Sequence, residues 1–248
     1  MQTLDQLICD VARAETNELS KVRDIAVFSD PHGSLTAFAA AHLRKHEDAR
    51  LFIGSRDILQ TFAALDIADA AGVGARVFAA GYETEIQLDI FFDDANAGFN
   101  GRIAPAQIDL ALTEMPKSLE ELRYFVRSLA GKRTIANSES SEKQPGSLVF
   151  IAGGNNKYLT RNQNAVIGEV FSQVHASRGR GKFRCLVGFG ASAEADPYHP
   201  VIGKMKLPCQ EKPAALYGVG GVFSGGKPDH GGEFLAQTAI ADFYGCVN

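Results

Sequence analysis

The stretch DIAVFSDPHG, residues 24–33, sets the expected fold. Its first five residues form a short apolar run, and the Ser-Asp-Pro-His-Gly segment after them is rich in turn formers, so a buried β-strand ending in a turn is predicted. The residues that follow place Leu35, Ala39 and His42 on one helical face. A strand, a turn and a helix in succession are the beginning of a βαβ unit.

The same alternation continues on both sides of this stretch. Before it, residues 4–17 carry apolar side chains at helical spacing. After it, short apolar runs predict strands at residues 50–53, 76–79, 85–92, 108–112, 147–152 and 182–189, and helical spacing covers residues 162–174. Short strands separated by amphipathic helices predict an α/β, Rossmann-like fold with a mostly parallel sheet and helices on both faces.

Two further helix starts carry capping signals. Ser55 is expected to cap a helix whose inner stripe includes Phe62 and Leu65. Ser118 and Glu121 have the spacing of a capping box, in which the two side chains satisfy N–H groups that a helix start leaves without partners. Both signals predict helices that follow strands directly.

Composition argues against several classes of protein. The formal net charge of −4 over 248 residues gives no global case for nucleic-acid binding, so any such site must be a local basic patch. The four cysteines are far apart and form no C-x-x-C pair, which favours a reducing interior over a zinc site or a disulfide framework. No secretory signal or membrane-length apolar run is visible. We therefore expect a soluble, cytoplasmic protein.

A basic run follows the predicted helix over residues 162–174. It consists of Arg178, Arg180, Lys182 and Arg184, with glycines at two of the intervening positions. If the segment is extended, the spacing of two puts all four side chains on one face. Such a cluster fits contact with an RNA backbone, and it equally fits a solvated strand face. The residues themselves leave both interpretations open.

The turn at residues 29–33 is a second candidate site. In doubly wound folds the first strand-to-helix turn commonly holds a cofactor. Here Gly33 is the only glycine of the turn, and Pro31 and His32 are bulky, so a simple turn is the favoured interpretation. The acidic residues near 89–94 and the scattered histidines lack metal-ligand spacing, and no metal site is expected. No G-x-G-x-x-G follows a predicted strand, which argues against a nucleotide-dependent oxidoreductase.

Four short segments of the chain carry recognisable motifs. They are DPHGSL at 30–35, DLALTEMPKSL at 109–119, VHASR at 174–178 with the basic residues after it, and GVFS at 221–224 followed by Asp229 and Gly231. Together they resemble the two-domain ribosomal RNA guanine-N2 methyltransferases. That family is a duplicated methyltransferase, with an N-terminal domain that has lost cofactor binding and a catalytic domain that uses S-adenosylmethionine.

The resemblance implies a division of this chain into three parts. Residues 1–190 correspond to the N-terminal methyltransferase-like domain, 191–213 to a linker, and 214–248 to the start of the catalytic domain. In the last part, the resemblance implies a partial cofactor-binding set. Its members are Phe223, Ser224, Asp229 and Gly231.

The chain also departs from the family pattern. The glycine-rich loop after the cofactor-binding strand is degraded at residues 242–248, and the family's Asn-Pro-Pro-Phe segment is missing. We therefore expect a truncated chain with no catalytic residues of its own, no S-adenosylmethionine bound to it, and no activity alone. Its expected role is to position ribosomal RNA. We expect no membrane partner and no bound metal ion. The alternative is a non-catalytic Rossmann-like module that binds RNA or protein.

The C-terminal segment suggests one further expectation. It carries apolar side chains that an incomplete domain would leave exposed, and such a surface promotes association between copies of the chain. We expect a homo-oligomer formed through this segment. The residues concerned are Phe234, Leu235, Ile240 and Phe243.

Overall fold

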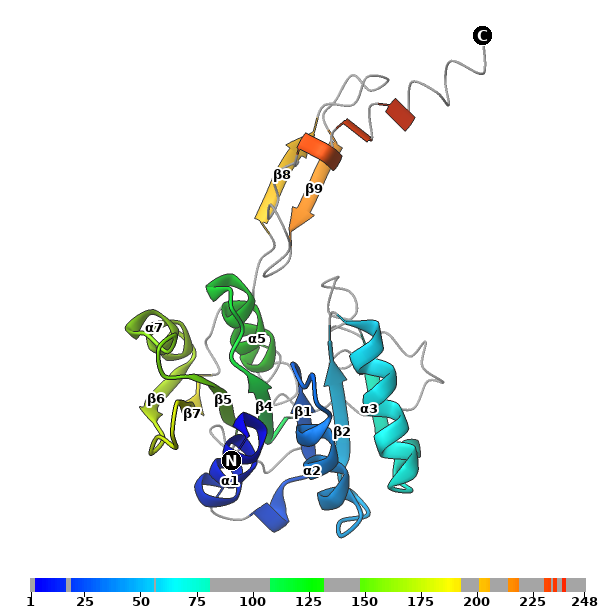
Figure 1. Cartoon of the computed structure of the whole chain (residues 1–248), viewed down its shortest axis with the longest axis vertical. Helices are drawn as coiled ribbons and strands as arrows, with labels where there is room; N and C mark the ends of the chain where they lie inside the picture. The colour runs from blue at the N-terminus through cyan, green and yellow to red at the C-terminus, as the bar shows by residue number, and fades with distance from the viewer. Residues whose placement is uncertain are drawn as a thin grey trace, which may run out of the picture. The chain divides into compact units, whose positions relative to one another are not determined.

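The computed structural model describes residues 3–16, 19–55, 57–80, 108–131, 148–192, 201–205, 214–218, 230–232, 234–235 and 238–239. The chain divides into two compact units, Met1–Tyr198 and His199–Asn248. The first unit contains a seven-stranded sheet. In the second, β8 (Val201–Met205) and β9 (Ala214–Gly218) pair antiparallel (Figure 1).

The sheet of the first unit has the strand order β3-β2-β1-β4-β5-β7-β6. Its strands are β1 (Asp24–Val27), β2 (Arg50–Gly54), β3 (Val77–Ala80), β4 (Leu110–Glu114), β5 (Val149–Asn155), β6 (Phe171–Ala176) and β7 (Phe183–Ala191). Strands β1 to β5 pair in parallel, and β7 runs antiparallel to both β5 and β6. The strand order reverses between β1 and β4, which is the place where open α/β sheets bind ligands.

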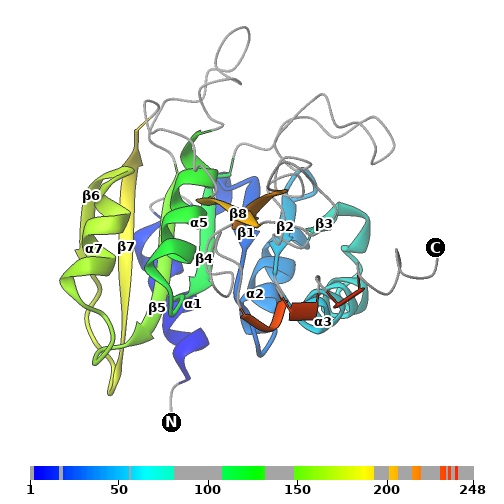
Figure 2. The same ribbon diagram turned by 90° about the horizontal axis from the view of Figure 1, so that it is seen from above.

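Helices cover both faces of this sheet. The helices of one face are α1 (Leu4–Glu15), α2 (Ser34–Leu43) and α3 (Ile58–Ala70), those of the other are α5 (Leu119–Gly131) and α7 (Arg161–Gly168), and the short helices η1 (Leu19–Lys21) and η2 (Gly74–Arg76) join elements. Alternate strand residues face opposite sides. In β1, Ile25 and Val27 pack in one apolar cluster with α1, α2 and α3. On the other face, Phe28 stacks on Phe125 of α5 with ring centroids 4.5 Å apart, and α5 lies beside α7 in Figure 2.

This architecture confirms the predicted α/β, Rossmann-like fold, with a mostly parallel sheet between helices. The strands and helices predicted around residues 4–17, 24–28, 50–53 and 76–79 are present. The strand expected at 85–92 lies outside the described residues. Among the helices that the structure describes, none is both long enough and apolar enough to cross a bilayer.

The predicted helix over residues 162–174 is wrong in its second half. Helix α7 ends at Gly168, and strand β6 begins at Phe171. Phe171 is buried and stacks on Phe150 of β5, with ring centroids 5.8 Å apart. The apolar residues on both sides of Gly168 keep helical spacing, so the prediction passed over this glycine, which is a helix-ending signal and is the last residue of α7.

The start of α3 also differs from the prediction. Asp57, not Ser55, is the N-cap, and its Oδ1 accepts the Leu59 N–H at 2.9 Å. The Ser55 hydroxyl instead accepts the Asp57 N–H at 3.1 Å. The expected inner stripe is also wrong at Phe62, which is 56% exposed, because small residues such as Ala64 make the buried contacts of this helix.

Candidate functional site

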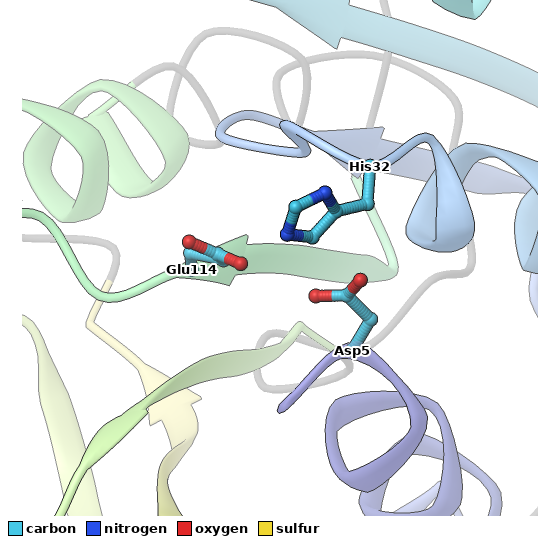
Figure 3. Close-up of side chains that lie close together, drawn as sticks. All are labelled: Asp5, His32 and Glu114. Atoms are coloured by element: carbon cyan, nitrogen blue, oxygen red, sulfur yellow. The ribbon is translucent and has the colours of Figure 1, made fainter. Parts of the chain in front are cut away.

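Three side chains from distant parts of the chain meet at the carboxyl ends of β1 and β4. Asp5 lies in the first turn of α1, His32 in the turn after β1, and Glu114 at the end of β4. One polar side-chain atom from each lies within 4.8 Å of those from the other two. Figure 3 shows all three side chains directed toward a common centre. The expectation of no metal site relied on spacing along the sequence, which cannot detect such convergence.

The position of Asp5 depends on how α1 begins and packs. Thr3 is the N-cap, and its hydroxyl accepts the Gln6 N–H at 3.3 Å. The helix lies close against β5 because Gly153 has no side chain, and a Cβ atom there would overlap Ile8. The close packing leaves Asp5 only 2% exposed.

The turn that carries His32 is held by its own acidic residue. Asp30 Oδ2 accepts the N–H and the hydroxyl of Thr36 at 2.8 and 2.7 Å, and Oδ1 accepts the Leu35 N–H at 3.2 Å. Gly33 has a φ of 71°, and a Cβ atom there would overlap Ile67 of α3, so the turn requires glycine. The Leu35 and Thr36 N–H groups, which could otherwise bind an anion at the start of α2, are satisfied by Asp30.

Glu114 joins the strand end to this turn. Its N–H donates to the Ser29 carbonyl at 3.0 Å. Burial, together with the charge of Asp5 and a side-chain hydrogen bond to it, raises the pKa of Glu114 to about 7, while a positive His32 acts in the opposite direction. Below about pH 7 the Glu114 carboxyl therefore retains its proton in the folded protein. The cluster can exchange that proton or offer two carboxylates and an imidazole to a cation.

Two of the cavities that border Glu114 also share Leu4 and Phe183. The first has a volume of about 440 Å³ and is lined by Thr3, Leu4, Asp5, His32, Glu114, Lys182 and Phe183. The second, of about 630 Å³, shares Glu114 with the first and also borders Lys117, Lys157 and Tyr158. Tyr158 is 65% exposed. Both volumes lie in the range of small-molecule sites, and basic and aromatic side chains border them.

The basic run lies around a hairpin turn and not along one strand. Arg180 and Phe183 form an isolated bridge, Gly181 between them has a φ of 58°, and of the four basic residues Arg184 lies within β7. All four basic side chains are exposed. Arg180 pairs with Asp10 of α1 at 2.6 Å, and Lys182 lines the 440 Å³ cavity. Their RNA-binding role stays a prediction.

The predicted cofactor-binding residues belong to the second unit. Phe223, Ser224 and Asp229 lie outside the described residues, and Gly231 lies in a short exposed helical turn. Of the residues expected to promote association, Phe234 is 71% exposed and Leu235 is 69% exposed. Ile240 and Phe243 lie outside the described residues. The cofactor role and the oligomeric state stay predictions.

No protein-family model matches the chain. No curated protein sequence matches it.

Solved structures of similar fold include several methyltransferases. The O-methyltransferase TomG from Streptomyces achromogenes, in complex with SAM, is 14% identical over 76% of this chain and 79% of its own, with a TM-score of 0.48. The 16S rRNA N2 methyltransferase RsmC from T. thermophilus, in complex with AdoMet and guanosine, is 15% identical over 96% of this chain and 52% of its own, with a TM-score of 0.48. TrmN from Thermus thermophilus is 14% identical over 74% of this chain and 49% of its own, with a TM-score of 0.46. Identities and scores this low transfer no activity to the chain.

Proposed function

We propose that the chain is a member of the S-adenosylmethionine-dependent ribosomal RNA guanine-N2 methyltransferases and that its first unit positions RNA. The observation that carries this proposal is the meeting of two of the resembling segments. DPHGSL forms the turn between β1 and α2, and DLALTEMPKSL forms β4 and the start of α5. The Glu114 N–H of the second segment donates to the carbonyl of Ser29, the residue just before the first segment, so both segments lie at the edge where open α/β sheets bind ligands.

Two features favour RNA positioning over cofactor binding in the first unit. The Leu35 and Thr36 N–H groups of α2 are occupied by Asp30, which leaves them unavailable to a cofactor. Lys117 and Lys157 border the 630 Å³ cavity beside the exposed Tyr158. Positive charge next to an exposed aromatic ring is the pattern with which proteins hold single-stranded nucleic acid.

We propose the domain division expected from the resemblance, with residues 1–190 as the RNA-positioning domain, 191–213 as a linker that contains β8, and 214–248 as part of a catalytic domain. S-adenosylmethionine is the cofactor of the whole enzyme. Phe223, Ser224, Asp229 and Gly231 would contribute to its site. A cytoplasmic location and absence of activity in this chain alone belong to the same proposal.

The salt dependence of RNA binding tests the RNA-positioning role. Fluorescence anisotropy with a ribosomal RNA fragment would be measured over a range of salt concentrations for wild type and for Arg178→Gln/Arg184→Gln. Each lost phosphate contact lowers the slope of log K against log salt by roughly 0.7–0.9, so the double variant should lose about 1.5. The matched control is Arg44→Gln/Lys45→Gln, which removes two exposed charges beyond α2 and should leave the slope unchanged.

Further outcomes distinguish the RNA-positioning role from the alternative, a non-catalytic Rossmann-like binding module. They are the salt dependence of the variant, the RNA preference, calorimetry of S-adenosylmethionine binding, and methyl transfer to RNA. An unchanged slope in Arg178→Gln/Arg184→Gln contradicts the RNA contact at the hairpin. RNA binding with no preference for ribosomal sequences favours a non-catalytic binding module. Tight S-adenosylmethionine binding, or transfer of a labelled methyl group to RNA by this chain, contradicts a purely positioning role.

A further inference from the structure

We propose that Asp5, His32 and Glu114 bind a divalent transition-metal ion whose remaining coordination positions face the 440 Å³ cavity. The three residues come from α1, from the turn after β1, and from β4. A metal ion at their centre would tie the start of α1 to the carboxyl edge of the sheet. The site is separate from any cofactor site that the family resemblance implies for the second unit.

Asp5 provides the observation that points to a bound cation. It is 2% exposed, and its Oδ1 has no hydrogen-bond partner among the residues that the structure describes. The carboxylate is directed toward His32 and Glu114, as Figure 3 shows. Burying a carboxylate oxygen without a donor costs free energy, and coordination to a cation would remove that cost.

The geometry requires a small adjustment to close around a metal ion. Two ligands at about 2.1 Å from one ion can be no more than ~4.2 Å apart, and the donor atoms here lie within 4.8 Å of one another. His32 is exposed in its turn, so its ring can rotate toward the two carboxylates without moving the core. Asp5 and Glu114 are fixed by α1 and β4.

The donor set indicates the class of metal. Two carboxylates and one imidazole suit Mn²⁺, Fe²⁺ or Zn²⁺, whereas Ca²⁺ and Mg²⁺ prefer sites made of oxygen alone. Two carboxylates, both deprotonated when the ion binds, balance the charge of a divalent ion. Three protein ligands leave positions open to water or to an oxygen-bearing ligand. Lys182, which lines the same cavity, would attract an anionic group on that ligand.

Binding of Mn²⁺ alone to the full chain tests this proposal. Mn²⁺ prefers oxygen and nitrogen donors, so the cysteines of the chain interfere little. Electron paramagnetic resonance of free Mn²⁺ should show loss of signal as wild-type protein is added, and Zn²⁺ should restore the signal by displacing the ion. Because His32 is exposed, His32→Ala should fold normally and weaken Mn²⁺ binding by at least about tenfold. Asp5→Asn and Glu114→Gln, which conserve side-chain shape, should weaken it similarly.

A second histidine–carboxylate pair supplies the control. His175 Nε2 lies 3.1 Å from Glu15 Oε1 on the exposed surface of the same unit. His175→Ala should leave Mn²⁺ affinity unchanged, and circular dichroism would verify that every variant is folded. No loss of the free-ion signal with wild-type protein overturns the proposal. Equal binding by His32→Ala and wild type also overturns it. Neither result depends on RNA or S-adenosylmethionine, so the proposed function is tested separately.

Discussion

Buried charges are paired differently at the amino and carboxyl ends of the strands in the seven-stranded sheet. At the amino ends, Asp24 of β1 and Arg50 of β2 form a two-pronged ion pair with N–O distances of 2.8 and 2.7 Å. Beside them, Asp109 Oδ2 accepts the N–H groups of Arg23 and Asp24 at 2.8 and 3.2 Å. Each of these two carboxylates accepts hydrogen bonds from N–H donors, so the negative charge of both is compensated.

At the carboxyl ends, two carboxyl groups face each other with less compensation. Asp5 and Glu114 lie beside an exposed His32, and Asp5 Oδ1 has no partner among the described residues. Buried charges that are fully paired hold a structure together, whereas incompletely paired ones in a cavity are typical of functional sites. Ion pairing at the amino ends therefore stabilises the fold, and the carboxyl ends are the candidate ligand-binding end of the sheet.

The largest effect is expected from Arg50→Ala at the amino end. The substitution leaves Asp24 buried without its cation, which should lower the free energy of unfolding by about 3 kcal/mol. Urea unfolding followed by circular dichroism measures the loss. Arg44→Ala, at an exposed position after α2, is the control and should change stability by less than about 0.5 kcal/mol. A loss at Arg50 no greater than at Arg44 would mean that the ion pair does not stabilise this end.

A smaller, pH-dependent effect is expected at Glu114 in metal-free buffer. Its pKa is raised from 4.5 to about 7 by burial and by Asp5, with Asp30 adding to the rise and His32 opposing it. The stability that follows from this raised pKa is fully present below pH 4.5 and is lost as the pH rises through about 7.

Comparison with Glu114→Gln isolates this contribution, because glutamine does not titrate. The free energy of unfolding of wild type, relative to that of the variant, should fall by roughly 2 kcal/mol across that pH interval. This value allows for partial exposure of the side chain. Urea midpoints of both proteins, measured below pH 4.5 and above pH 7, provide the test. A constant difference would show that Glu114 titrates normally in the folded protein.

The smallest effect is expected from Asp5→Asn in the same metal-free buffer. The amide removes one of two facing carboxyl groups and can donate to Glu114, which offsets the lost interaction of a negative charge with the start of α1. The free energy of unfolding should change by less than about 1 kcal/mol. A loss as large as that of Arg50→Ala would show that Asp5 is a structural residue and would remove the contrast between the two ends.

Much of the fold could be predicted because its signals are local. The strand-turn-helix pattern over residues 24–43, and the apolar stripe that buries Leu122 and Phe125 in α5, depend on residues a few positions apart. The alternation of Phe183, Cys185, Val187 and Phe189 correctly predicted one face of β7, which packs in the cluster of α1. Around Phe171 the apolar spacing continued the helical period, and it outweighed the helix-ending Gly168 in the prediction.

The sequence alone determined the order of strands and helices except for β6, which was predicted as helix. From that order it determined the Rossmann-like class, because hydrophobic period and turn residues act over short distances. Only the tertiary structure decided the candidate site. Asp5, His32 and Glu114 carry no shared motif, and they meet because α1 packs against β5 at Gly153 while β1 and β4 pair side by side. Such convergence depends on packing between distant segments, which spacing along a chain does not encode.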